Sequence, residues 1–95
     1  MIMAIFKEND LKYSYNWNPE VVEKLPKKIR FNDSYELNTE EGYEVLLFIN
    51  SYMELRNLAM KTTFEKIEHI LKEELPETKR GLSKAKRFLT ENYFF

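Results

Sequence analysis

The spacing of apolar residues changes along the chain, from period two near the N-terminus to a helical period further on. Leu11, Tyr13, Tyr15 and Trp17 alternate with polar residues, as in a half-buried strand. The segment before them, residues 2–7, is mostly apolar, and residues 8–10 have the composition of a turn. We therefore expect a β-hairpin over residues 2–17, with a third strand between residues 28 and 37.

Helix signals follow in four places. Asn18-Pro19-Glu20 predicts the start of a short helix that ends before Pro26. Asn38 or Thr39 is expected to cap a main helix reaching residue 60, a capping box over residues 62–65 starts a second, and a third follows residue 76. Their predicted apolar faces comprise Val45, Leu46, Phe48, Ile49, Tyr52, Met53, Leu55, Ala59 and Met60, then Phe64, Ile67, Ile70, Leu71 and Leu75, then Leu82, Ala85, Leu89 and Tyr93.

These elements predict an α+β fold: a small N-terminal antiparallel β-hairpin or sheet followed by three helices, mostly helical overall. The 95 residues are enough for one domain with one core, and 43% hydrophobic residues predict that the chain folds. We expect a single domain over residues 1–95. In it residues 1–37 are β-rich with a short helix, and residues 38–95 are helical.

The charges nearly cancel overall but are distributed unevenly. The chain has 15 basic and 16 acidic residues, so its formal net charge is −1. Residues 37–75 contain four basic and eight acidic residues, whereas residues 76–95 contain five basic and two acidic ones. An obligate nucleic-acid-binding protein is usually more basic than this as a whole. The basic C-terminal part is the exception.

The residue types exclude several kinds of chemistry. Without cysteine there is no disulfide, no thiolate nucleophile and no cysteine-bound zinc. Two glycines do not make a phosphate-binding loop, and His69, the single histidine, does not make an ordinary zinc site. We predict no catalytic residue, no metal and no cofactor. The lack of cysteine and of a long apolar run predicts a cytoplasmic protein with no membrane contact.

Two features of the main helix depart from a plain amphipathic pattern. Arg56 falls within the predicted apolar face, where it is either paired with a carboxylate, extended past the helix end, or an anchor for a partner. Leu47 and Leu58 fall on the predicted polar side. They contact either the N-terminal hairpin, another helix, or a second copy of the chain in a homodimer.

Two further candidates lie in the C-terminal part. Arg80, Lys84 and Arg87 are spaced to share one face of the last helix, which is either solvated or a site for phosphates or an acidic protein. Tyr93, Phe94 and Phe95 end the chain with aromatic side chains, which either fold onto the core or insert into a partner.

From these features we expect a small non-catalytic interaction protein that binds and regulates or inhibits a protein partner. Its composition is typical of accessory proteins of phages and mobile elements, which is an association without a mechanism. The alternative is a nucleic-acid-binding regulator that uses the basic C-terminal helix. A second alternative is a small metal-dependent hydrolase, since carboxylates are plentiful.

Overall fold

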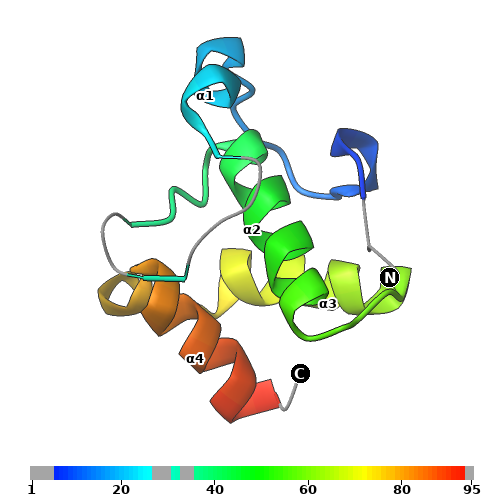
Figure 1. The fold of residues 1–95 in the computed structure, drawn as a ribbon, viewed down its shortest axis with the longest axis vertical. Helices are drawn as coiled ribbons and strands as arrows, with labels where there is room; N and C mark the ends of the chain where they lie inside the picture. Colours follow the sequence, from blue (N-terminus) through cyan, green and yellow to red (C-terminus); the bar gives the residue numbers. More distant parts are fainter. Residues whose placement is uncertain (1–5, 27–30, 33–35, 94–95) are drawn as a thin grey trace.

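The computed structural model describes residues 6–26, 31–32 and 36–93. Within these ranges the chain forms four α-helices and two short 3-10 helices (Figure 1). In chain order these are η1 (Glu8–Asp10), α1 (Pro19–Lys24), α2 (Gly42–Leu55), α3 (Lys61–Glu73), η2 (Glu77–Lys79) and α4 (Leu82–Tyr93). None of the described helices combines the length and apolar character that a membrane span needs.

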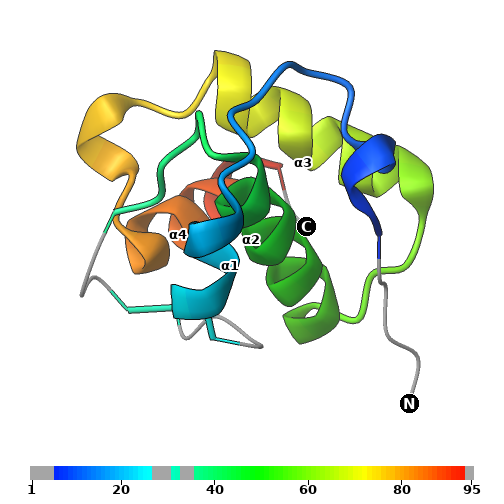
Figure 2. The same ribbon diagram turned by 90° about the horizontal axis from the view of Figure 1, so that it is seen from above.

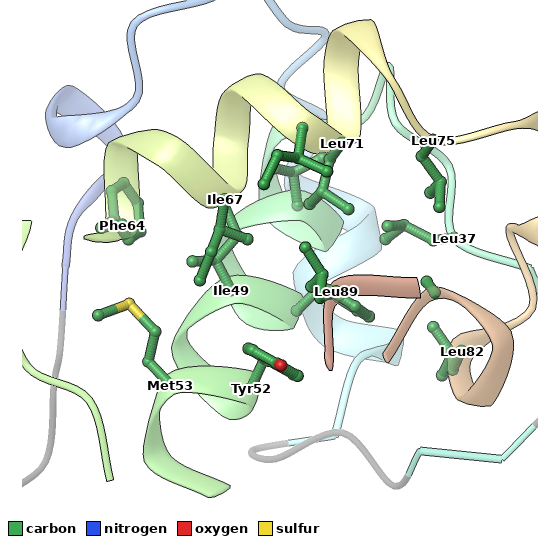
Figure 3. Packing of buried hydrophobic residues seen from close by; sticks show 14 of the residues in the cluster. Leu37, Ile49, Tyr52, Met53, Phe64, Ile67, Leu71, Leu75, Leu82 and Leu89 are labelled. Carbon is green, nitrogen blue, oxygen red and sulfur yellow. The ribbon is translucent and has the colours of Figure 1, made fainter. Parts of the chain in front are cut away.

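The core lies where α2, α3 and α4 meet, with α2 at the centre of the molecule (Figures 1 and 2). The predicted apolar stripe of α3 is confirmed, because all five of its residues are buried. Most of the predicted faces of α2 and α4 are buried too, and each such side chain stabilises the fold by roughly 1.5–3 kcal/mol. Figure 3 shows the three helices directing their apolar side chains toward one another, among them Ile49, Tyr52, Met53, Phe64, Ile67, Leu71, Leu82 and Leu89.

The prediction of an N-terminal β-hairpin is wrong, and with it the α+β fold class. No strand occurs in the described part of residues 2–17, and residues 2–5 lie outside the described ranges. Residues 11–17 instead run as a single irregular segment from η1 past α3 to α1 (Figure 2). The period-two pattern reflects a real alternation, since Leu11 is buried while Lys12 and Ser14 are exposed. The main partner of this segment is the surface of α3, and Asn16 adds one isolated parallel bridge with Glu41.

The carboxylate of Glu68 accepts the backbone hydrogen bonds that a second strand would accept in a hairpin. Glu68 lies on α3 and is only 1% exposed. The backbone N–H of Lys12 donates to both of its oxygens at 3.0 Å, and that of Tyr13 donates to Oε2 at 3.0 Å. The hydroxyl of Tyr15 donates to the same oxygen at 2.6 Å. Backbone donors that a sheet would satisfy are thus satisfied by one buried acid.

A second buried carboxylate, that of Glu41, fixes the start of α2. It accepts from the side chain of Asn18 at 2.6 Å and from the backbone N–H of Tyr43 at 3.3 Å, which caps the helix. The predicted caps Asn38 and Thr39 are wrong, because the side chain of Asn38 accepts from the N–H of Glu40 instead and holds a turn ahead of the helix.

Residues 36 and 37 reach the helical core without forming the predicted third strand. Glu36 makes an isolated antiparallel bridge with Gly81, and the N–H of Leu37 donates to the carbonyl of Arg80 at 2.7 Å. Residues 31 and 32 are not in a strand either. The rest of the predicted third strand, residues 28–30 and 33–35, lies outside the described residues.

The main helix was predicted to reach residue 60 but ends at residue 55. Asn57 has a left-handed φ of 57°, its N–H donates to the carbonyl of Glu54, and the N–H of Leu58 donates to that of Met53. This pair of bonds is a Schellman motif, which asparagine can terminate because it tolerates the left-handed region. Arg56 is the residue that caps the helix.

The start of α3 also differs from the sequence prediction. The helix begins at Lys61, and its capping residue is Met60, whose carbonyl accepts from the N–H groups of Thr63 and Phe64. The expected capping box over residues 62–65 is therefore inside the first turn and does not cap the helix. The start of α1 was predicted correctly, with Asn18 as cap and Pro19 as the first helical residue.

Replacing Glu68 by alanine is expected to lower the free energy of unfolding by about 3 kcal/mol, because several donors lose their acceptor in a partly buried position. Glu65→Ala is the matched control one turn away: its pair with Lys12 is at the surface, and its loss is expected to cost under about 1 kcal/mol. Urea denaturation measures both values. Equal effects of the two substitutions would contradict the role of Glu68.

The Tyr15 phenol makes stability depend on pH above neutrality. Burial, together with its hydrogen bond to Glu68, raises the pKa of Tyr15 well above the usual value of 10.0. The unfolded chain therefore loses this proton before the folded chain does, so the free energy of unfolding falls as the pH rises through about 10. We expect Tyr15→Phe to reduce that fall when unfolding is compared at about pH 8.5 and about pH 10.5. An unchanged slope would show that the phenol does not titrate in this way.

Candidate functional site

The side chains of His69 and Asp10 each contact other parts of the chain. His69 Nδ1 is 2.9 Å from the Tyr13 hydroxyl, and Nε2 is 3.7 Å from a carboxylate oxygen of Glu74. Asp10 pairs with Lys61 of α3 at 3.5 Å. No group of three potential metal ligands occurs in residues 6–26, 31–32 and 36–93. The contacts of Tyr13 with His69 and of Asp10 with Lys61 attach the N-terminal segment to α3.

The exposed side of α4 carries the predicted basic side chains Lys84 and Arg87. Leu82, Ala85 and Leu89 of this helix are fully buried, which turns Lys84 and Arg87 toward solvent. Arg80 does not belong to this helix face. It lies between η2 and α4, is half-buried, and its Nε is buried with no hydrogen-bond partner.

A first hollow of about 240 Å³ lies on one side of the exposed face of α4. Residues of η2, which precedes the helix, form its other wall, so that Lys79 takes the place expected for Arg80. The half-buried ring of Phe88 adds an apolar surface to it. The residues that line this hollow are Thr78, Lys79, Lys84, Arg87, Phe88 and Glu91.

A second hollow of about 300 Å³ lies against the other side of the same face. Arg56, at the end of α2, and Lys86 of α4 both line it. The structure therefore brings Arg56 beside Arg87, two candidates that the sequence analysis treated separately. The residues that line the second hollow are Arg56, Ser83, Lys86, Arg87, Thr90 and Glu91. We call the two hollows together the basic surface.

Four cations of the basic surface make no ion pair with a described residue, namely Lys79, Lys84, Lys86 and Arg87. Cations near the N-terminal segment are arranged differently. Lys12 and Lys61 each pair with a carboxylate, and Lys72 both donates to the carbonyl of Thr39 and pairs with the carboxylate of Glu40. No described carboxylate neutralises the charges of these four side chains.

An apolar groove of about 300 Å³ separates α1 from α2. Leu47 lines it, and Leu58 follows the end of α2. Both leucines are half-buried and pack against the core. The two leucines thus do not share a helix face as predicted, because α2 ends before Leu58. The groove is lined by Val22, Leu25, Pro26, Tyr43, Leu46, Leu47 and Asn50.

Of the terminal aromatic residues, Tyr93 is half-buried and packs against the core, with its ring 6.2 Å from that of Phe88. For Tyr93 alone, this placement agrees with the expectation that the terminal aromatic side chains fold onto the core. Phe94 and Phe95 lie outside the described residues.

Glu91 was not predicted as a member of the site, and Lys79 and Lys86 flank the predicted basic face in the sequence without a predicted role. Glu91 is one helical turn after Arg87, so its place on the exposed face of α4 was available from the spacing. The position of Arg56 near α4 could not be predicted from the sequence, because it depends on how α2 packs against α4.

Exposure of Arg56 changes the expected effect of its removal. A buried, paired arginine would cost roughly 3–5 kcal/mol on removal. Because Arg56 is exposed at a helix end, we expect Arg56→Ala to lower the free energy of unfolding by under about 1 kcal/mol. Met53→Ala, which truncates a fully buried side chain of the same helix, is expected to cost about 2–5 kcal/mol. A loss of comparable size for Arg56 in thermal or urea unfolding would contradict this placement.

Comparison with known proteins leaves the site to be interpreted from its own chemistry. No family model, no curated protein and no solved structure matches this chain.

Proposed function

We propose that this chain is a non-catalytic interaction protein that binds an acidic segment of a partner protein on the basic surface of α4. The observation that carries the proposal is a group of cations around two adjacent hollows that make no ion pair with a described residue, namely Lys79, Lys84, Lys86 and Arg87. Clustered like charges destabilise a fold slightly by mutual repulsion. Such a cluster favours the approach of a molecule of opposite charge.

The shape of the basic surface supports a protein partner. Hollows of this kind accept individual side chains, and the aromatic ring of Phe88 offers apolar contact beside the charges. Arginine, present here as Arg56 and Arg87, is enriched among residues that dominate protein interfaces and matches a carboxylate with two parallel N–H donors.

Nucleic acid is the alternative ligand, and the charge of the surroundings disfavours it. Glu91 lines both hollows, and the acidic residues of the segment 37–75 outnumber its basic ones by eight to four. Phosphates along a strand carry one charge each with no cation between them, so a strand crossing the surface meets Glu91 as well as the lysines. A protein segment can vary its charge from residue to residue.

The double substitution Lys84→Glu and Arg87→Glu tests the proposal. The probe is a fluorescent 20-residue polyglutamate peptide, with binding followed by anisotropy at low and physiological salt. We expect the double variant to bind about tenfold more weakly or worse, since two attractive charges become repulsive. The matched control, Lys7→Glu with Lys24→Glu, makes the same change in net charge on exposed residues of the N-terminal part and is expected to change binding by less than about threefold.

Circular dichroism checks that both variants keep the helical signal of the parent chain. Equal loss in the two variants would mean that only net charge matters, and the proposed surface would be wrong. A labelled 20-base-pair duplex serves as the competing probe. If it binds more tightly than about 1 µM at physiological salt and the Lys84, Arg87 double variant abolishes this, the nucleic-acid alternative replaces the proposal.

A further inference from the structure

The two hollows of the basic surface are separated by one row of side chains, and this row contains Glu91, the only acid among the described residues that line them. At 100° per residue, Arg87 and Glu91 lie one turn apart along the same line of α4. Both residues line both hollows. Lys84 and Phe88 lie on one side of this row, and Lys86 and Thr90 on the other.

The charges therefore alternate across the helix. Lys79 and Lys84 belong to the first hollow, Arg56 and Lys86 to the second, and Glu91 stands between them. Glu91 is exposed and makes no ion pair with a described residue. A ligand that crosses the row thus meets positive charge, then a carboxylate beside Arg87, then positive charge again.

From this pattern, and building on the proposed function, we infer that the basic surface recognises a protein segment in which a cationic side chain lies between two acidic ones. The acidic side chains enter the two hollows, and the cation pairs with Glu91 above the row. Glu91 then acts as the specificity-determining residue, because it attracts the central cation and repels a ligand that is negative throughout.

The dimensions fit an extended segment that crosses α4. A helix with its side chains is about 10–12 Å wide, and an extended chain advances about 13 Å over four residues at 3.2–3.4 Å each. Side chains at positions i, i+2 and i+4 of such a segment point to the same side. The central side chain of the three then faces the Arg87–Glu91 row, while the outer two reach the hollows.

Three peptides of equal length test this order. Each has five central residues within the same neutral Gly-Ser flanks: Glu-Ser-Arg-Ser-Glu, the isomer Arg-Ser-Glu-Ser-Glu, and the fully acidic Glu-Ser-Glu-Ser-Glu. The first two have the same composition and net charge, so any difference between them reports the order of charges. Binding to the 95-residue chain is measured by chemical-shift titration, which also locates the contact.

We expect the peptide with central arginine to bind at least about fivefold more tightly than its isomer. In the Glu91→Gln variant this ratio is expected to fall below about twofold, while the fully acidic peptide gains affinity. Glutamine keeps the size of the side chain and removes its charge, so the helix stays intact. Glu23→Gln is the matched control: it removes the same charge from an exposed residue of α1 that lines neither hollow, and it is expected to keep the ratio of the parent chain.

The outcomes separate this inference from the proposed function. Equal binding of the two isomers, or a ratio unchanged in Glu91→Gln, would overturn the inference. If the peptides still bind and lose affinity in the double variant of Lys84 and Arg87, the proposed function stands without it. If none of the three shifts residues of the basic surface and polyglutamate does not bind either, both proposals are wrong.

Discussion

Burying a carboxylate is unfavourable unless hydrogen-bond donors surround it. Because Glu68 is buried in the core, the fold must bring donors to its side chain. The donors come from residues 12–15, which are more than 50 positions away along the chain. Once this segment lies along α3, Asn16 is placed to exchange backbone hydrogen bonds with residues 40 and 42, and Asn18 to donate to Glu41. The start of the central helix α2 is thereby tied to the middle of α3.

This constraint explains which part of the fold was predictable from sequence. The helical stripes follow from local periodicity, and most of their residues are buried as predicted. Leu55, Ala59 and Met60 are exposed, because α2 ends at residue 55. The alternation of residues 11–17 was also seen, but alternation reports only that one side of an extended segment is buried. It does not distinguish a strand from a segment whose donors bond to side chains. Glu68 itself offered a signal, since it falls within the stripe between Phe64 and Leu71.

The site was predictable only where it depends on a single helix. Lys84 and Arg87 were expected on the exposed face of α4 from spacing alone, and they are there. Arg80 was misplaced because the helix begins at Leu82, and Arg56 was misplaced because the Schellman motif ends α2 before it. The same early end carries Arg56 to the second hollow. Helix boundaries, which depend on single residues such as Asn57, thus decided which charges share a surface.

The indole of Trp17 lies against the first turn of α2, where a β-carbon on Gly42 would stand 2.6 Å from the ring. The glycine is needed for this close approach and not for its backbone angles, since no glycine in the described ranges has a positive φ. The sizes of the side chains at positions 17 and 42 therefore limit each other. A larger residue at 42 becomes acceptable only with a smaller one at 17, so sequences that keep this fold should vary the two positions together. Since Trp17 is the single tryptophan, its fluorescence reports directly whether that contact is intact.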